Sequence, residues 1–301
     1  MKILLRKKSG LDAGKTRAGI LFVLPSILIF SVFVFIPLIN TFVFSTLNFD
    51  MMFNNVHFLG FSNYVKLFHD QSFFNALYNT VYYTLGVVPI QLVLALLVAV
   101  AVSKQTKLNS VFRSIYFLPA ICSMTIISIV WTFLIDKDIG IVSYFLSRIG
   151  IKVPALLKDP FWAMPTIILV GVWKNFGFNM VILVAGLQGI PDSYYEAAEV
   201  DGASSVVKFF KITIPMLMPT LTFVVVNSII SSFQVFDQVF VMTRGGPLFK
   251  TETVVQYIYK TVFSSYDMGY ASTVAVALFI LTICVSLYMF KVMRKRENDY
   301  E

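Results

Sequence analysis

The chain has 301 residues, of which 57% are hydrophobic, 16% aromatic and only 13% charged. Its mean hydropathy of +0.79 excludes an ordinary soluble domain and indicates an integral membrane protein. The net charge of +8 would suit a nucleic-acid partner, but the Lys and Arg residues cluster at the ends of apolar runs, so we expect no nucleic-acid binding.

The segment 1–17 is a basic tail with six Lys and Arg residues. Its run from Gly10 to Thr16 resembles the phosphate-binding loop of ATPases. That motif needs four residues between its glycines and a preceding strand, whereas three residues separate Gly10 from Gly14 and no strand precedes them. We therefore expect the chain not to be an enzyme and to bind no ATP, magnesium or other cofactor itself.

Six stretches are apolar and long enough to cross a hydrocarbon core of roughly 30 Å as helices. They are 18–44, 77–102, 114–135, 161–187, 217–242 and 268–293. The first is too long for the apolar region of a signal peptide and is expected to stay in the mature chain. Cys122 and Cys284 lie within spans and are interpreted as small apolar residues, so we expect no metal site. The expected fold is an all-α membrane protein with a six-helix domain over 18–293 and a tail over 294–301.

The basic residues predict the orientation of these spans. An even number of spans places both termini on one side, together with the loops 103–113 and 191–215, and this side carries 15 Lys and Arg residues. The opposite loops carry 8, although they are longer in total. Because cytoplasmic loops are enriched in Lys and Arg, we expect both termini and the 191–215 loop in the cytoplasm.

The polar loop after the fourth span predicts a first short helix. Pro191 ends the register of the span, and Ser193 followed by Glu196 fits a capping box in which Ser193 is the N-cap. The next residues, Ala197 and Ala198, lack bulk and would allow another surface to approach closely.

The same loop then predicts a turn and a second short helix. Asp201-Gly202 is a strong turn dipeptide, and Ser204 or Ser205 can cap the helix that follows, before Pro215 starts the fifth span. The apolar side chains of this second helix are Val206, Val207, Phe209 and Phe210. The loop is either an interfacial helix pair whose phenylalanines dip into lipid or a docking element for another protein. The glycine turn between two helices favours docking.

The fourth and fifth spans carry polar side chains, which are costly in lipid and tend to face a bundle interior or a wet cavity. Asn175 and Asn179 are one helical turn apart in the fourth span, beside Trp173 and Phe176. In the fifth span, polar side chains recur at helical period and predict a single stripe next to Phe233; they are Asn227, Ser231, Gln234 and Gln238. Amides beside flat aromatic rings suit sugar recognition. The alternative is that these amides simply hold helices together.

Lys174 and Asp237 are the only charged residues well inside the predicted spans. At a rise of 1.5 Å per residue their depths differ by roughly 12 Å, so we expect no direct ion pair. Lys174 is expected to reach a backbone carbonyl or a partner protein, and Asp237 to lie near the extracytoplasmic mouth.

The order Glu196-Ala197-Ala198, then Gly202, then Ile212 to Pro215 resembles the EAA loop of permease subunits in binding-protein-dependent ABC importers. Ile214 replaces the usual Leu and keeps the apolar character. Further runs resemble the carbohydrate-uptake branch of this family; they are 58–64, 112–119, and 233–237 followed by 243–247. The last of these, 233–237 with 243–247, is similar to the MalF-like partner rather than the MalG-like one.

This resemblance implies the type I ABC importer permease fold and a cytoplasmic element that couples to a separate ATPase. The coupling residues that it implies are Glu196, Ala197, Ala198, Asp201, Gly202, Ala203, Phe209, Phe210, Ile212 and Pro215. It implies as partners a second, MalG-like permease, two ABC ATPase subunits that hold ATP and magnesium, an extracytoplasmic solute-binding protein and a carbohydrate solute. The implied location is the plasma (inner) membrane of a bacterium or archaeon.

Two other classes stay open. An ion-coupled secondary transporter or channel would often show paired broken helices or rows of buried acids, and Asp237 alone gives little to carry protons or sodium. A structural or assembly membrane protein explains the apolar spans but not the spacing around Glu196. The sequence does not name the solute.

Overall fold

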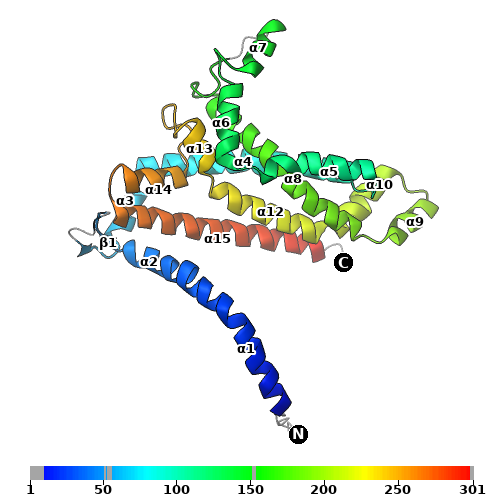
Figure 1. The fold of residues 1–301 in the computed structure, drawn as a ribbon, viewed down its shortest axis with the longest axis horizontal. Helices are drawn as coiled ribbons and strands as arrows, with labels where there is room; N and C mark the ends of the chain where they lie inside the picture. Colours follow the sequence, from blue (N-terminus) through cyan, green and yellow to red (C-terminus); the bar gives the residue numbers. More distant parts are fainter. Residues whose placement is uncertain (1–9, 51, 53–55, 151–153, 299–301) are drawn as a thin grey trace.

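The computed structural model describes residues 10–50, 52, 56–150 and 154–298 as a bundle of long helices with short elements at its two ends (Figure 1). The long helices that run side by side are α4 (Gln71–Ala101), α8 (Ala163–Gln188), α12 (Met218–Phe233) and α15 (Met268–Asn298). With α13 (Asp237–Met242), which continues α12, they coincide with four of the predicted spans to within a few residues. The prediction of these spans is confirmed.

One end of the bundle, called the β1 end, carries a small hairpin and two short helices. Strands β1 (Leu47–Asn48) and β2 (His57–Phe58) pair antiparallel, with Leu47 opposite Phe58. The helices at this end are α3 (Ser62–Phe68) and α14 (Val254–Phe263), whereas α7 (Ile141–Arg148) lies at the tip of a separate projection from the bundle (Figure 1). The opposite end, called the α9 end, carries α9 (Asp192–Val200) and α10 (Ser205–Lys208), and α15 ends there (Figure 1).

The first predicted span is one long, gently curved helix that leaves the bundle (Figure 1). It consists of α1 (Gly10–Phe30), a π-helical turn (Ser31–Phe35) and α2 (Ile36–Phe44). Only α2 packs along α15, and none of the most apolar window of the span is buried by the rest of the chain. The helix already covers Gly10 to Thr16, so the segment that resembled a phosphate-binding loop is not a loop.

The third predicted span is not a straight helix, which corrects the prediction of one continuous helix over 114–135. It is divided into α5 (Lys107–Ile121) and α6 (Met124–Leu134), which meet at an angle of 95°. Cys122 between them adopts an extended backbone, and Pro119 within α5 removes one helical hydrogen bond just before the bend. Hydropathy does not reveal such a bend, because both halves are apolar.

Close helix contacts rely on small residues, since burial against lipid-like side chains gives little drive for association in a bilayer. A Cβ at Gly177 of α8 would lie 1.9 Å from the backbone oxygen of Tyr116 in α5, and one at Gly269 of α15 would lie 2.1 Å from that of Leu47. Only glycine allows these backbones to approach as they do. These glycines therefore fix how α5 and the hairpin sit against the bundle.

Candidate functional site

A cavity of about 140 Å³ lies inside the bundle between α4, α8 and α12. We call it the polar cavity; it is lined by Tyr83, Val87, Gln91, Asn175, Phe178, Asn179, Asn227, Ser228, Ser231 and Ser232. Its described lining has amides and hydroxyls but no charged side chain. Phe178 and Ser231 are also exposed at the surface of the chain, so the cavity opens on one side of the bundle.

The structure brings four of the predicted pathway residues to this cavity, two from each span. Asn175 donates from Nδ2 to the backbone oxygen of Gly171 at 3.0 Å, within its own helix. Asn179 donates from Nδ2 to Ser228 Oγ at 3.1 Å and thereby joins α8 to α12. The predicted alternative, that these amides hold helices together, thus describes one contact of Asn179, while both amides also face the cavity.

The predicted single stripe in the fifth span is interrupted, which is a second correction. The helix stops at Phe233 and restarts at Asp237, so residues before and after the break do not share one helical face. Asn227 and Ser231 line the cavity, whereas Gln234 is exposed at the break. Phe233 is buried in an apolar cluster with residues of α14 and α15 and does not line the cavity.

Gln238 lies beyond the break and is buried against α4. Its Nε2 donates a hydrogen bond to the hydroxyl of Tyr83, which is itself buried and lines the cavity. A Cβ at Gly171 would lie 2.5 Å from that hydroxyl, so the side-chain pair fits only because α8 has a glycine here. Tyr83 was not predicted as a site residue, because nothing in the sequence distinguishes it from the neighbouring Tyr82.

Trp173, Lys174 and Asp237 lie outside the polar cavity. Trp173 is partly exposed and its ring meets that of Trp131 edge-on, with centroids 5.5 Å apart. Lys174 donates from Nζ to the backbone oxygen of Ala120 at 3.3 Å, so the expectation that it reaches a carbonyl is confirmed. It forms no ion pair with the exposed Asp237 among the residues described, as expected.

Residues 192–216, called the arm, form the candidate docking element at the α9 end. The first helix starts at Asp192 directly after Pro191, and no side chain caps it, which corrects the predicted capping by Ser193. Pro191 takes the N-cap position with an extended backbone, so Ser193 lies inside the first turn. The predicted cap of the second helix is confirmed at Ser204, whose hydroxyl accepts from Val207 N at 3.4 Å.

The two helices of the arm meet at the predicted turn. Gly202 has a φ of +74°, the left-handed conformation that glycine adopts without strain, and a Cβ there would meet nothing within 4 Å. Two side-chain contacts link the helices: Tyr195 and Thr213 are joined by their hydroxyls at 3.0 Å, and Lys208 pairs with Glu199 at 3.5 Å.

The arm is exposed for most of its length and carries apolar side chains without cover. Val200 is 89% exposed, Val206 66% and Phe210 63%. The second helix continues as a π-helical turn (Phe209–Thr213) into α11 (Ile214–Met216) and then into α12. A cavity of about 730 Å³ separates the arm from the ends of α4 and α8. The arm thus connects rigidly to the fifth span but only loosely to the rest of the bundle.

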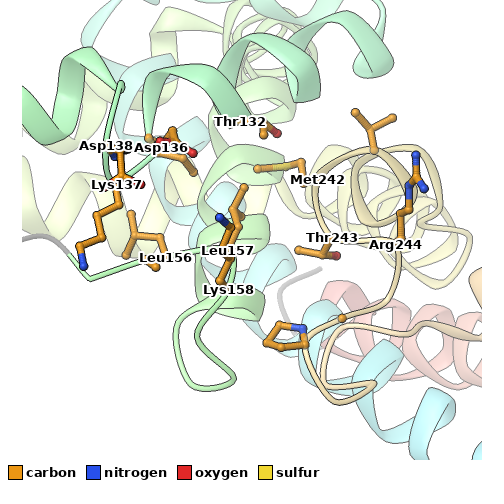
Figure 2. A pocket seen from close by; sticks show the side chains of 15 residues that line it. Thr132, Asp136, Lys137, Asp138, Leu156, Leu157, Lys158, Met242, Thr243 and Arg244 are labelled. Atoms are coloured by element: carbon orange, nitrogen blue, oxygen red, sulfur yellow. Dashed lines mark hydrogen bonds between the residues drawn. The ribbon is translucent and has the colours of Figure 1, made fainter.

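A further cavity of about 460 Å³ lies between the loops that follow α6 and α13 (Figure 2). Figure 2 shows Asp136, Lys137 and Asp138 on one side and Thr243 and Arg244 on the other. Its charges are of both signs and it lies outside the bundle, in contrast to the neutral polar cavity.

A partly buried hydrogen-bond cluster connects three helices at the β1 end. Asp70 accepts hydrogen bonds from the hydroxyls of Tyr257 at 2.6 Å and Tyr270 at 2.5 Å, and so connects the start of α4 to α14 and α15. Partial burial would raise the pKa of Asp70, but the two hydroxyls and two backbone N–H groups outweigh it and hold the pKa below its ordinary value. Lys66 pairs with Asp267 at 3.2 Å beside this cluster.

The fold agrees with that of a known protein. Over 96% of this chain and 99% of the other, the structure superposes with a TM-score of 0.80 and 24% identity on the crystal structure of a bacterial ABC transporter involved in the import of the acidic polysaccharide alginate. At that identity the likeness establishes the fold, which is that of an ABC importer permease.

Relatives in sequence match almost end to end. The lactose transport system permease protein LacF of Rhizobium radiobacter is 36% identical over 285 residues, covering 93% of this chain and 95% of the relative. The probable ABC transporter permease protein YurN of Bacillus subtilis (strain 168) is 33% identical over 283 residues, covering 93% and 97%. The sulfoquinovosyl glycerol transport system permease protein SmoG of Agrobacterium fabrum (strain C58 / ATCC 33970) is 31% identical over 288 residues, covering 95% and 94%.

The family model described as "binding-protein-dependent transport system inner membrane component" matches residues 58–296, which include every element that lines the polar cavity and the whole arm. The chain therefore belongs to this family, as a membrane-embedded permease subunit of an ABC importer.

Proposed function

We propose that this chain forms half of the pathway for a sugar or sugar-like solute and couples to a separate ATPase through the arm. The observation that carries the proposal is the polar cavity: a neutral set of amides and hydroxyls beside Phe178, in the middle of an apolar bundle. Hydroxyl-rich solutes need such hydrogen-bonding groups together with a flat apolar face. Relatives whose names mention lactose and arabinooligosaccharides support this class of solute.

The proposed partners follow from the surfaces that the chain leaves uncovered. The cavity opens on one side and is smaller than the 300–1,000 Å³ of a usual ligand site, which supports a second permease that supplies the other half. The exposed Val200, Val206 and Phe210 on the arm support docking into an ATPase subunit, which would bind ATP and magnesium in place of this chain. An extracytoplasmic binding protein would deliver solute at the β1 end.

The proposed orientation places the α9 end, the arm and both termini in the cytoplasm. The arm would then move with the ATPase subunits, and the helices would rock to open the cavity to one side or the other. Solute shifts this equilibrium only if it binds the two states with different affinity. Residues Gln234, Asp237 and Trp173 are assigned to the wider pathway around the cavity, and the tails 1–17 and 294–301 to the cytoplasmic face.

Transport by proteoliposomes tests this function. The full complex, co-expressed with its partner permease, ATPase subunits and binding protein, is expected to accumulate a labelled neutral sugar when ATP is inside the vesicles. Uptake is expected to survive collapse of the proton and sodium gradients, which distinguishes the importer from an ion-coupled secondary transporter. Gradient-driven uptake without ATP, or purification without an ATPase subunit, would contradict the proposal.

Labelling in cells tests the orientation. After Cys122 and Cys284 are replaced by Ser, the variant Val200→Cys is expected to react with a membrane-impermeant maleimide only when the cells are opened. Labelling of intact cells would place the arm outside and contradict coupling to an ATPase.

A further inference from the structure

Gln91 on α4 has a buried side-chain oxygen that no part of the described chain satisfies. The residue is 3% exposed, and its Oε1 is shielded from solvent without a hydrogen-bond partner among the described residues. A buried carbonyl oxygen without a donor is costly, and such groups are rare in folded proteins. We therefore infer that the hydrogen-bond donor to this oxygen comes from a molecule other than the described chain.

The position of Gln91 shows where that donor would come from. Tyr83, Val87 and Gln91 are spaced by four residues, so they form one face of α4, and all three line the polar cavity. Across the cavity, the amides of Asn175 and Asn179 already donate within the protein. The hydroxyl of Tyr83 already accepts from Gln238. Among these polar groups, Gln91 is the one whose oxygen is both shielded from solvent and without a hydrogen-bond partner among the described residues, so it is the group that most needs a donor from a molecule inside the cavity.

The chemistry of the cavity limits what this molecule is. Gln91 Oε1 needs an O–H or N–H donor, and an amide that rotates to present its Nε2 instead would still need a polar partner. The described lining offers no charge to neutralise an anionic solute, and burying an unpaired anion is far more costly than burying a hydroxyl. A neutral, hydroxyl-rich solute fits both conditions.

We propose that Gln91 discriminates between solutes by accepting a hydrogen bond from one hydroxyl of a neutral sugar. Gln91 lies on α4, a helix that was not part of the predicted pathway. This inference rests on the proposed function and adds a specificity residue to it. A site that hydrogen-bonds a solute hydroxyl rejects analogues without that group, because its own polar atom is then left unpaired.

The test compares two glutamines in the reconstituted full complex. Gln91→Leu keeps the size of the side chain and removes its polar end. Gln256→Leu is the matched control, because Gln256 is also buried, at 5% exposed, and its Oε1 is also unpartnered, but it lies on α14 and lines none of the described cavities. The probes are labelled lactose, maltose and raffinose as neutral sugars, with glycerol 3-phosphate and galacturonate as anions.

The expected result is a change in selectivity. Gln91→Leu should lower the maximal uptake rate of the best neutral sugar by about three- to tenfold, the factor for one lost neutral hydrogen bond, and alter its ratio to the second-best sugar. Gln256→Leu should leave both the rate and the ratio as in the wild type. A merely structural role would lower all rates together and leave the ratio unchanged.

Other outcomes overturn the inference, and they separate it from the proposed function. If the wild type carries a neutral sugar and Gln91→Leu matches Gln256→Leu in rate and ratio, the role of Gln91 is wrong while the importer function stands. If the wild type carries only the anions, the neutral solute class is wrong as well. Should Gln91→Leu fail to assemble, Gln91→Met offers a flexible apolar side chain of similar size for the same comparison.

Discussion

At the scale of single residues, the β1 end depends on hydrogen bonds to one carboxylate. Asp70 accepts hydrogen bonds from the hydroxyls of Tyr257 and Tyr270, which lie on two consecutive helices far from Asp70 in the sequence. Because these contacts favour the charged form, they lower the pKa of Asp70 below its value in an unfolded chain. The contacts therefore make the free energy of unfolding depend on pH.

The sign of that dependence follows from the lowered pKa. The stabilisation is complete above the unfolded pKa of about 3.9 and is lost as the pH falls through the lower folded value. At pH 7 the wild type should unfold at a higher temperature than Asp70→Asn, and the gap should close toward pH 3. The gap should be small, since Asp70 is mostly accessible to solvent and screened.

Thermal unfolding of the purified protein in detergent, followed by near-ultraviolet circular dichroism, measures this gap. The control is Asp138→Asn in the exposed loop before α7, which should unfold like the wild type at every pH. A gap that stays constant from pH 7 to pH 3 would show that the charge of Asp70 is not what stabilises the cluster.

Lys174 is a second residue whose hydrogen bond affects the local structure, here the bend between α5 and α6. Its ammonium donates to the oxygen of Ala120, at the carboxyl end of α5 and next to the 95° bend. A cation at a helix C-terminus meets unpaired carbonyls and the negative end of the helix dipole. Lys174 therefore stabilises the bend where the helix would otherwise leave its last oxygens unpaired.

Lys174→Met keeps the apolar stem and removes the donor. We expect it to lower ATP-driven uptake several-fold, because the bend between α5 and α6 becomes less fixed, whereas Lys174→Arg should retain most of the activity. Asp237→Asn tests the other embedded charge in the same uptake assay. Full activity of Lys174→Met in both uptake and stimulated ATP hydrolysis would show that the contact is dispensable.

At the scale of elements, the sequence predicted the number of spans well and their shapes less well. Long apolar stretches identify α4, α8 and α15 because hydropathy depends only on side-chain type. The bend at Cys122 and the break after Phe233 are backbone events within apolar stretches, so hydropathy does not register them.

The candidate site, like the spans, was predicted only in part from the sequence. Polar side chains on α8 and α12 were predicted to face a cavity because such groups are costly in lipid, and three amides and one hydroxyl of that set do line it. Gln91 carried the same signal, as the only polar residue between Leu85 and Val102, and was missed. Gln234 and Phe233 were placed by helical periodicity, which fails where the helix breaks.

The turn of the arm at Gly202 allows a test of how α9 and α10 act together. Gly202 has a positive φ between α9 and α10, in open space, so a substitution there costs backbone strain of roughly 1 kcal/mol but no clash. Gly202→Asp adds this strain and a charge at the turn that is proposed to enter the ATPase. We expect ATP hydrolysis to persist while uptake falls at least tenfold.

Gly150→Asp is the matched control for this variant. Gly150 also has a positive φ, of +81°, and a Cβ there would also meet nothing within 4 Å, but it follows α7, outside the arm. The two substitutions impose the same strain and charge at different places. Equal loss of uptake in both would point to a general effect of the substitution rather than to coupling.

At the scale of the whole molecule, the chain is built as one side of a larger pathway. The polar cavity is open on one side, and the exposed apolar side chains of the arm face away from the bundle. The first span is the third incomplete surface, since only its α2 part packs on the bundle and no other helix of the described residues packs along α1 (Figure 1). All three features are consistent with a subunit whose partner completes it.

The first span therefore allows a test of assembly. We expect α1 to lie against the partner permease, because a span that leaves its own bundle has no intramolecular contacts to fix its direction, and helix packing is what sets tilt in a bilayer. Phe33 is 74% exposed in this chain and lies in the middle of the span. A photoreactive benzoylphenylalanine at this position should crosslink to the partner permease in the assembled complex. The product should vanish when the partner is not co-expressed, whereas crosslinks to lipid alone in the complete complex would show that α1 faces the bilayer.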